Sequence, residues 1–284
     1  MAHLLRIAIL LLFMYSFGPR VYAQLTLPQA SSAQVITQDL GISTIKISYH
    51  RPNAHGRVIF GDLVPYGEVW RTGANTVTNI HFDKEVSMAG HVVPAGEYGL
   101  LTIPKENSWT IILSKNNTQW GAYTYQEKED LIRFEVEVER VEQAVETFSI
   151  YFSEVYPQSA NLNIAWAHTR VRFPITVDQD AEITASILSS IDSADKKPYF
   201  SAAQYYYNTD KDLKQALTWI NLAEQGDPEA VHIKYWKALI QLKSGDRQGA
   251  IATATQGVAL AKASQNPEYV KLNASVLEQA KSSQ

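Results

Sequence analysis

The residues most able to do chemistry are concentrated in residues 49–75, which read YHRPNAHGRVIFGDLVPYGEVWRTGAN. This stretch holds three arginines, two histidines, two acidic residues, four glycines and four aromatic residues, and it follows the period of no regular element. Such a composition is typical of loops held by a scaffold, where binding and catalytic residues are over-represented. Three roles are open to it: tying the loops together, binding a ligand, and acid–base catalysis.

In the structural interpretation, the arginines hold the loops together. Arg51, Arg57 and Arg71 pair with Asp62 and Glu68 or with loop carbonyl groups, because one guanidinium carries five hydrogen-bond donors. The glycines supply turns with positive φ. A chain with no cysteine cannot use disulfides for this purpose.

In the binding interpretation, the same loops form a pocket for a small anionic or carbohydrate ligand. An arginine takes a carboxylate, sulfate or phosphate through two parallel hydrogen bonds, and flat aromatic faces receive a sugar ring. In an acidic chain, arginines this close together form a local positive region that favours an anionic group. The candidate ligand-binding residues are Arg51, Arg57, Tyr66, Trp70, Arg71, Asn75, Trp120 and Tyr123.

In the catalytic interpretation, His50 or His55 acts as the general base, with Asp62 or Glu68 as the orienting or acidic group. The chain has no GxSxG, HExxH or P-loop motif, and no GxGxxG sequence that opens a helix. The spacing of the four histidines between residues 50 and 91 fits no standard metal-ligand pattern. We therefore predict a non-catalytic binding module with no metal site and no cofactor; an extracytoplasmic hydrolase is the alternative.

The elements that position these residues follow a period of two from Gln24 to Asp178. Phe134, Val136 and Val138, for example, alternate with charged residues, as expected of an antiparallel strand with one solvated face. Many short strands without helical segments between them predict an antiparallel β-sandwich, jelly-roll-like in architecture. The predicted strands are 35–38, 45–49, 78–82, 85–89, 98–103, 109–114, 134–138, 147–152, 161–166 and 169–177, with a hairpin turn at Pro94-Ala95-Gly96.

After Asp178 the period becomes helical, so we place a domain boundary there. A connecting helix and linker are expected over 179–198, and a helical domain over 199–284. The motif DLKQAL at Asp212 recurs as DRQGAI at Asp246, an offset of 34, which is the length of a tetratricopeptide unit. We predict a small all-α, tetratricopeptide-like domain that docks on the β domain or binds a partner protein. If the loops of residues 49–75 are purely structural, this domain is the functional, protein-binding part of the chain.

The first 23 residues have the features of a cleavable secretory signal. Arg6 precedes an apolar run from Ile7 to Phe17, and the predicted cut lies between Ala23 and Gln24. That run is too short to anchor the chain, and no later stretch is apolar enough to span a bilayer. We expect an exported protein, periplasmic or secreted, that is not a lipoprotein because the chain has no cysteine. A net charge of −4 with no basic run argues against nucleic acid as a partner.

Several motifs of the chain resemble those of one exported bacterial family. They are the stretch 49–75, PAGEY at 94–98, LTIP at 101–104, WTII at 109–112 and QWG at 119–121. Together they resemble the family catalogued as domain of unknown function 2911, and the helical tail is similar to an extension that many of its members carry. The resemblance implies a fold and export. It brings no established activity and no catalytic residues.

Overall fold

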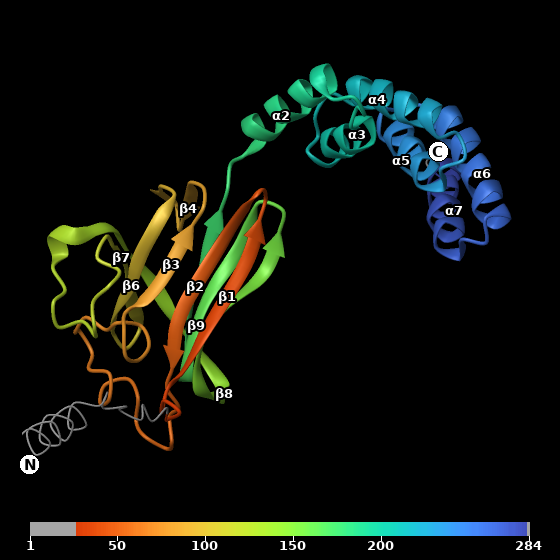
Figure 1. Ribbon diagram of the computed structural model, residues 1–284. Coiled ribbons are helices and arrows are strands. Elements are labelled where there is room, and N and C mark those ends of the chain that lie inside the picture. The colour runs from red at the N-terminus through yellow and green to blue at the C-terminus, as the bar shows by residue number, and fades with distance from the viewer. Residues whose placement is uncertain (1–26, 283–284) are drawn as a thin grey trace, which may run out of the picture. The chain divides into compact units, whose positions relative to one another are not determined.

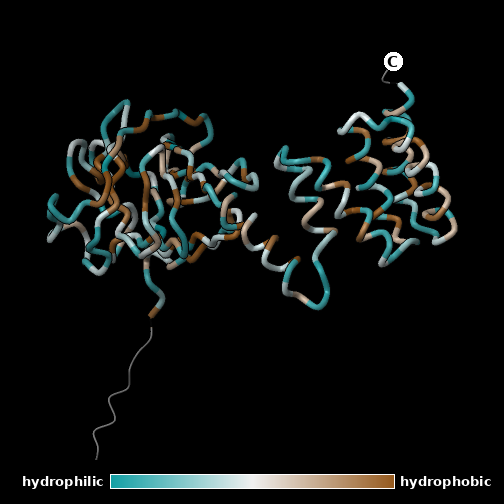
Figure 2. The backbone as a smooth tube through the Cα atoms, turned by 90° about the horizontal axis from the view of Figure 1, so that it is seen from above, coloured by the Kyte–Doolittle hydropathy of each residue, from teal (hydrophilic) through white to brown (hydrophobic). Residues whose placement is uncertain are grey.

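The computed structural model describes residues 27–282, and the chain divides into two compact units after Asp178 (Figure 1). Strands build the first unit, and helices build the second, which begins at Gln179. The predicted signal segment, residues 1–23, lies outside the described residues. Among the described residues, no helix has the length and apolarity needed to cross a membrane. Hydrophobic and hydrophilic residues alternate over short distances along both units (Figure 2).

The first unit contains one open antiparallel sheet. Its strands are β1 (Ser32–Leu40), β2 (Ser43–Arg51), β3 (Thr78–Phe82), β4 (Val86–Met88), β5 (His91–Val93), β6 (Gly96–Pro104), β7 (Ser108–Ser114), β8 (Asp130–Tyr156) and β9 (Ser159–Thr176). The nine strands follow the order β1-β2-β3-β6-β7-β8-β9-β4-β5. The prediction of an antiparallel β structure is therefore confirmed.

Two long strands replace four of the predicted short ones. Strand β8 joins the predicted strands 134–138 and 147–152, and β9 joins 161–166 and 169–177. The register between β8 and β9 shifts at several points. Each such irregularity breaks the alternation of inward and outward side chains, so one continuous strand looks like two in the sequence.

The predicted hairpin at Pro94-Ala95-Gly96 is wrong. The hairpin lies earlier in the chain, between β4 and β5, where Ala89 and Gly90 have φ of 49° and 86°. Pro94-Ala95-Gly96 instead leads from β5 at the sheet edge to β6 in its interior, and these two strands do not pair. Proline and glycine mark a change of chain direction, but they do not determine which strands pair afterwards.

An aromatic cluster fixes residues 49–75 to the core of the first unit. Trp70 stacks on Trp166 of β9 with ring centroids 6.0 Å apart, and it makes edge contacts with Phe60, Trp109 and Phe148. Trp109 and Trp166 are 0% and 2% exposed, as their positions in the strand patterns predict. The loops of residues 49–75 are thus held by a large buried aromatic side chain.

The second unit contains six helices within the described residues, so the predicted helical tail is confirmed (Figure 1). They are α2 (Asp180–Ser193), α3 (Tyr199–Asn208), α4 (Leu213–Gly226), α5 (Val231–Lys243), α6 (Arg247–Ala263) and α7 (Pro267–Ser282). The repeated motif marks two helix starts. The Asp212 carboxylate accepts the N–H of Lys214 at 2.8 Å before α4, and the Asp246 carboxylate accepts the N–H of Gly249 at 2.9 Å at the start of α6.

Helix α6 approaches α7 closely at Gly257, and this contact gives a testable prediction. A Cβ at Gly257 would collide with the side chain of Asn273, which is fully buried. We expect Gly257→Ala to lower the free energy of unfolding of the helical unit by about 1–3 kcal/mol. Gly226→Ala is the matched control, since a Cβ there meets no atom within 4 Å. It should be neutral or stabilising by up to about 1 kcal/mol. Urea unfolding followed by circular dichroism compares the two, and equal midpoints would rule out the close approach.

Candidate functional site

The loops of residues 49–75 enclose a pocket of about 430 Å³, which we call the Arg71 pocket. Five of the predicted site residues line it: His55, Arg57, Trp70, Arg71 and Asn75. Trp166 of β9 also lines it, although its strand pattern predicts only a core position. Arg51, Tyr66, Trp120 and Tyr123 are not among the lining residues.

Arg71 is the charged group of this pocket that has no hydrogen-bond or ion-pair partner among the described residues. Its side chain is half-buried, and its Nε is buried with no hydrogen-bond partner. Within the described part of the chain it forms no ion pair. Burial lowers the pKa of Arg71 from its ordinary value, and the Tyr123 phenol acts on that pKa in the opposite direction. The guanidinium is therefore partly removed from water, and its Nε has gained no acceptor among the described residues, although an arginine remains charged in proteins.

The backbone around this arginine is strained. His55, Thr72 and Asn75 all have left-handed φ, of 50°, 55° and 60°. For a β-branched residue such as Thr72 this conformation is an outlier, at a cost of about 1–3 kcal/mol. Two hydrogen bonds hold it: Thr72 Oγ1 lies 3.1 Å from Thr102 Oγ1, and the Thr72 carbonyl accepts from Thr78 Oγ1 at 2.5 Å. The fold thus imposes the backbone conformation directly after the unpaired arginine.

The other two arginines of the stretch make structural contacts. Arg51 donates from Nε to the Phe148 carbonyl at 3.0 Å and from Nη2 to Ser149 Oγ at 2.8 Å, which ties β2 to β8. Arg57 donates to the carbonyls of its own turn, residues 53–54, at 2.6 and 3.0 Å. These contacts match the carbonyl pairing of the structural interpretation. No ion pair with either acidic residue of the stretch occurs in the described chain.

The groups of the catalytic interpretation are not brought together. Asp62 and Glu68 are exposed, and within residues 27–282 neither hydrogen-bonds a histidine side chain. Nδ1 of His50 is buried and has no hydrogen-bond partner in the part of the chain that the structure describes. His55 is held through its backbone, whose N–H donates to Glu146 Oε1 at 2.9 Å. Among the described residues, no three His, Cys, Asp or Glu side chains are grouped so that they could hold a metal ion.

Two exposed aromatic residues stand on a loop next to the pocket. Trp120 is 64% exposed and Tyr123 is 85% exposed. Their loop is joined to the pocket wall by backbone contacts. Gly121 N–H donates to the Asn75 carbonyl at 3.0 Å, and Thr76 forms an isolated antiparallel β-bridge with Trp120.

The remaining aromatic candidates have other surroundings. Trp70 is only 8% exposed, and its Nε1 donates to the Gly73 carbonyl at 3.1 Å. Tyr66 is 41% exposed and its ring lies over Gly61, 2.8 Å from where a Cβ would stand. Trp70 therefore supports the pocket from the core, and Tyr66 covers a turn outside it.

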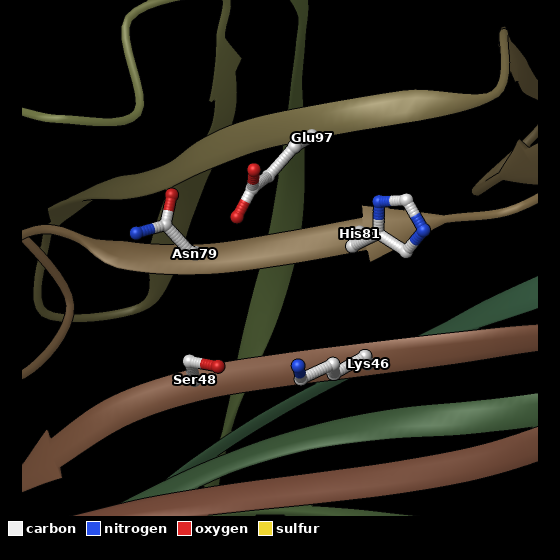
Figure 3. A pocket seen from close by; sticks show the side chains of 5 residues that line it. All are labelled: Lys46, Ser48, Asn79, His81 and Glu97. Atoms are coloured by element: carbon white, nitrogen blue, oxygen red, sulfur yellow. The ribbon is translucent and has the colours of Figure 1, made fainter.

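A second hollow of about 220 Å³ lies on the face of β2, β3 and β6 (Figure 3). We call it the sheet-face hollow. Its lining residues are Lys46, Ser48, Asn79, His81 and Glu97. In the sequence they are the polar residues of alternating strands, a pattern that indicates only a solvated face. No signal in the sequence brings them together, because three separate strands supply them.

Comparison with known proteins identifies a family for the first unit. The family model described as "Protein of unknown function (DUF2911)" matches residues 31–175, just over half of the chain. The matched residues include both the Arg71 pocket and the sheet-face hollow, apart from Ala30 in the pocket wall. No curated protein and no solved structure matches the chain.

Proposed function

The chain belongs to the DUF2911 family, whose description names no activity, and on that premise we propose from its own residues that it binds a small anionic ligand in the Arg71 pocket. The observation that carries the proposal is the half-buried, unpartnered Arg71 guanidinium. A charge that has left water without finding a partner costs free energy. A carboxylate, sulfate or phosphate recovers that cost, because it accepts two parallel hydrogen bonds from a guanidinium.

The surroundings of Arg71 support a ligand with a ring as well as a charge. The pocket volume, about 430 Å³, is within the range of small-molecule sites. Beside it, Trp120 and Tyr123 offer exposed aromatic faces. We place the acidic group of the ligand on Arg71 and its ring against these two residues, so that an acidic sugar is the preferred ligand class.

We also propose the finer architecture that the sequence indicates. The first unit is then a sandwich, which is supported by the contact of Tyr49 in β2 with Ile150 in β8, two strands that are not neighbours in the sheet order. The second unit is a tetratricopeptide-like stack that recruits a partner protein, which is supported by aspartate caps at the two positions 34 residues apart. The mature protein acts outside the cytoplasm.

Arg71→Met tests the pocket. The protein is titrated with inorganic phosphate, sulfate, acetate, glucuronate and glucose, and melting is followed by fluorescence. A ligand at 100 times its Kd raises the free energy of unfolding by about 2.7 kcal/mol. We expect one of the anions to stabilise the wild type and Arg71→Met to weaken it at least about tenfold, since a hydrogen bond to a charged group contributes about 1.5–3 kcal/mol.

Arg140→Met is the matched control, because Arg140 is an exposed residue of β8 outside the pocket. It makes the same change in charge and should leave binding intact. Without ligand, Arg71→Met should melt within about 0.5 kcal/mol of the wild type, since the guanidinium has no hydrogen bond or ion pair with the described residues to lose. Equal binding by both variants would reject the site. A large loss of stability in Arg71→Met would make the arginine a structural clasp and leave the helical unit as the functional part.

A further inference from the structure

Three titratable side chains form a polar row across β2, β3 and β6. Lys46 stands directly opposite His81, and His81 stands directly opposite Glu97. Neighbouring strands lie about 4.8 Å apart, so the row spans about 10 Å. All three residues are exposed, and within the described part of the chain Lys46 and Glu97 form no ion pair. The row therefore carries a cation at one end and an anion at the other, and the protein neutralises neither.

The floor of the sheet-face hollow is the next position along these strands. Ser48 pairs with Asn79, and Asn79 pairs with Gly99, so short side chains flank the asparagine. A Cβ at Gly99 would stand 2.5 Å from the Asn116 carbonyl oxygen, so the backbone at Asn116 lies over Gly99. Asn79 Oδ1 is buried and accepts no hydrogen bond from any residue between 27 and 282. Asparagine is disfavoured within strands, yet here it occupies a strand with partners on both sides.

The polar groups of the hollow separate into acceptors and donors. Figure 3 shows the Glu97 carboxylate turned toward Asn79 and away from the His81 ring. The Glu97 carboxylate is thus the accessible acceptor on the β6 side, since the Asn79 amide oxygen is buried. On the β2 side, the Lys46 ammonium and the Ser48 hydroxyl are donors.

We propose that the sheet-face hollow binds a free α-amino acid. The ligand ammonium group donates to the Glu97 carboxylate, and the ligand carboxylate accepts from the Lys46 ammonium and the Ser48 hydroxyl. A zwitterion pairs both charges at once, whereas a ligand of one charge leaves one side unpaired, and this difference is the basis of specificity. A volume of about 220 Å³ suits a ligand smaller than those of typical small-molecule sites. The hollow shares no lining residue with the Arg71 pocket, so the two sites are independent.

The test is calorimetric titration of the full chain with each standard L-amino acid. We expect at least one to bind saturably. Its N-acetyl derivative lacks the ammonium charge, its methyl ester lacks the carboxylate, and each should bind at least about tenfold more weakly. Lys46→Met and Glu97→Gln should each weaken binding by a similar factor. Because both residues are exposed and unpaired, neither variant should change the melting temperature.

Lys128→Met and Glu137→Gln are the matched controls, because both residues are exposed and neither lines the hollow. Both should bind like the wild type, and so should Arg71→Met. The proposal is overturned if no amino acid binds saturably, or if Lys46→Met and Glu97→Gln bind as the controls do. It is also overturned if the N-acetyl derivative binds as tightly as the free amino acid, since Lys46 alone would then hold an anion.

Discussion

Gly99→Ala should lower the free energy of unfolding of the first unit by about 3 kcal/mol, the upper end of the usual cost of overpacking. The Cβ would stand 2.5 Å from the carbonyl oxygen of Asn116. That oxygen belongs to the backbone, so no side-chain rotation can relieve the collision. Strand β6 also pairs with β3 and β7 on its two sides, which prevents it from moving away. The chain after Asn116, which carries Trp120 and Tyr123, is therefore displaced, and ligand binding at the Arg71 pocket should weaken as well.

Gly56→Ala provides the control for this substitution. Gly56 has φ of 71° and no atom within 4 Å of its Cβ position, so alanine there bears only the cost of a left-handed backbone, about 1–2 kcal/mol. Urea unfolding followed by tryptophan fluorescence measures both variants. If Gly99→Ala is no more destabilising than Gly56→Ala, the close contact between β6 and Asn116 does not exist in solution.

Tyr49→Phe should cost about 2 kcal/mol, because it leaves buried polar groups unpaired. Tyr49 is 3% exposed, and its hydroxyl donates to Gln34 Oε1 at 2.6 Å and accepts the Ile150 N–H at 3.0 Å. Burial is the main cause that raises the pKa of its phenol. Phenylalanine keeps the ring contact with Phe148, whose centroid is 5.8 Å away, so the variant isolates the loss of the hydroxyl.

Tyr123→Phe makes the same chemical change on the surface. Its side chain is 85% exposed, so the lost hydroxyl contacts water and the variant should match the wild type within about 0.5 kcal/mol. The two midpoints are compared in urea at neutral pH. Equal midpoints would mean that the Tyr49 hydroxyl does not tie β2 to β8.

The sequence predicts those parts of the fold whose causes are local. Asp212 and Asp246 mark helix starts because a capping carboxylate binds N–H groups only two or three residues away. The alternation of apolar and polar residues marks strands for the same reason, because the pattern lies within the strand itself. Strand order has no local cause: Tyr49 meets Ile150 across 101 residues of chain, and neither position carries a signal for the other.

The candidate site likewise has a part that the sequence predicts and a part that it does not. The composition of residues 49–75 singles out three arginines, but it does not show which of them has protein partners and which is free to bind a ligand. Arg51 and Arg71 differ only in their surroundings, since Phe148 and Ser149 occupy the donors of the first and nothing in the described chain occupies those of the second. The sheet-face hollow was not predicted, because each of its residues taken singly is an ordinary polar residue of a strand.

The long-range tie between β2 and β8 also determines when the first unit can finish folding. A ribosome adds about 5–20 residues per second, so the 101 residues between Tyr49 and Ile150 take about 5–20 s to synthesise. During that interval the partner of Tyr49 does not yet exist, and the first strands cannot be completed. The helical unit is made after the first unit, but its contacts are mostly local, and such units fold within milliseconds. Each nascent chain thus spends several seconds with its first unit incompletely folded, in a state open to chaperones.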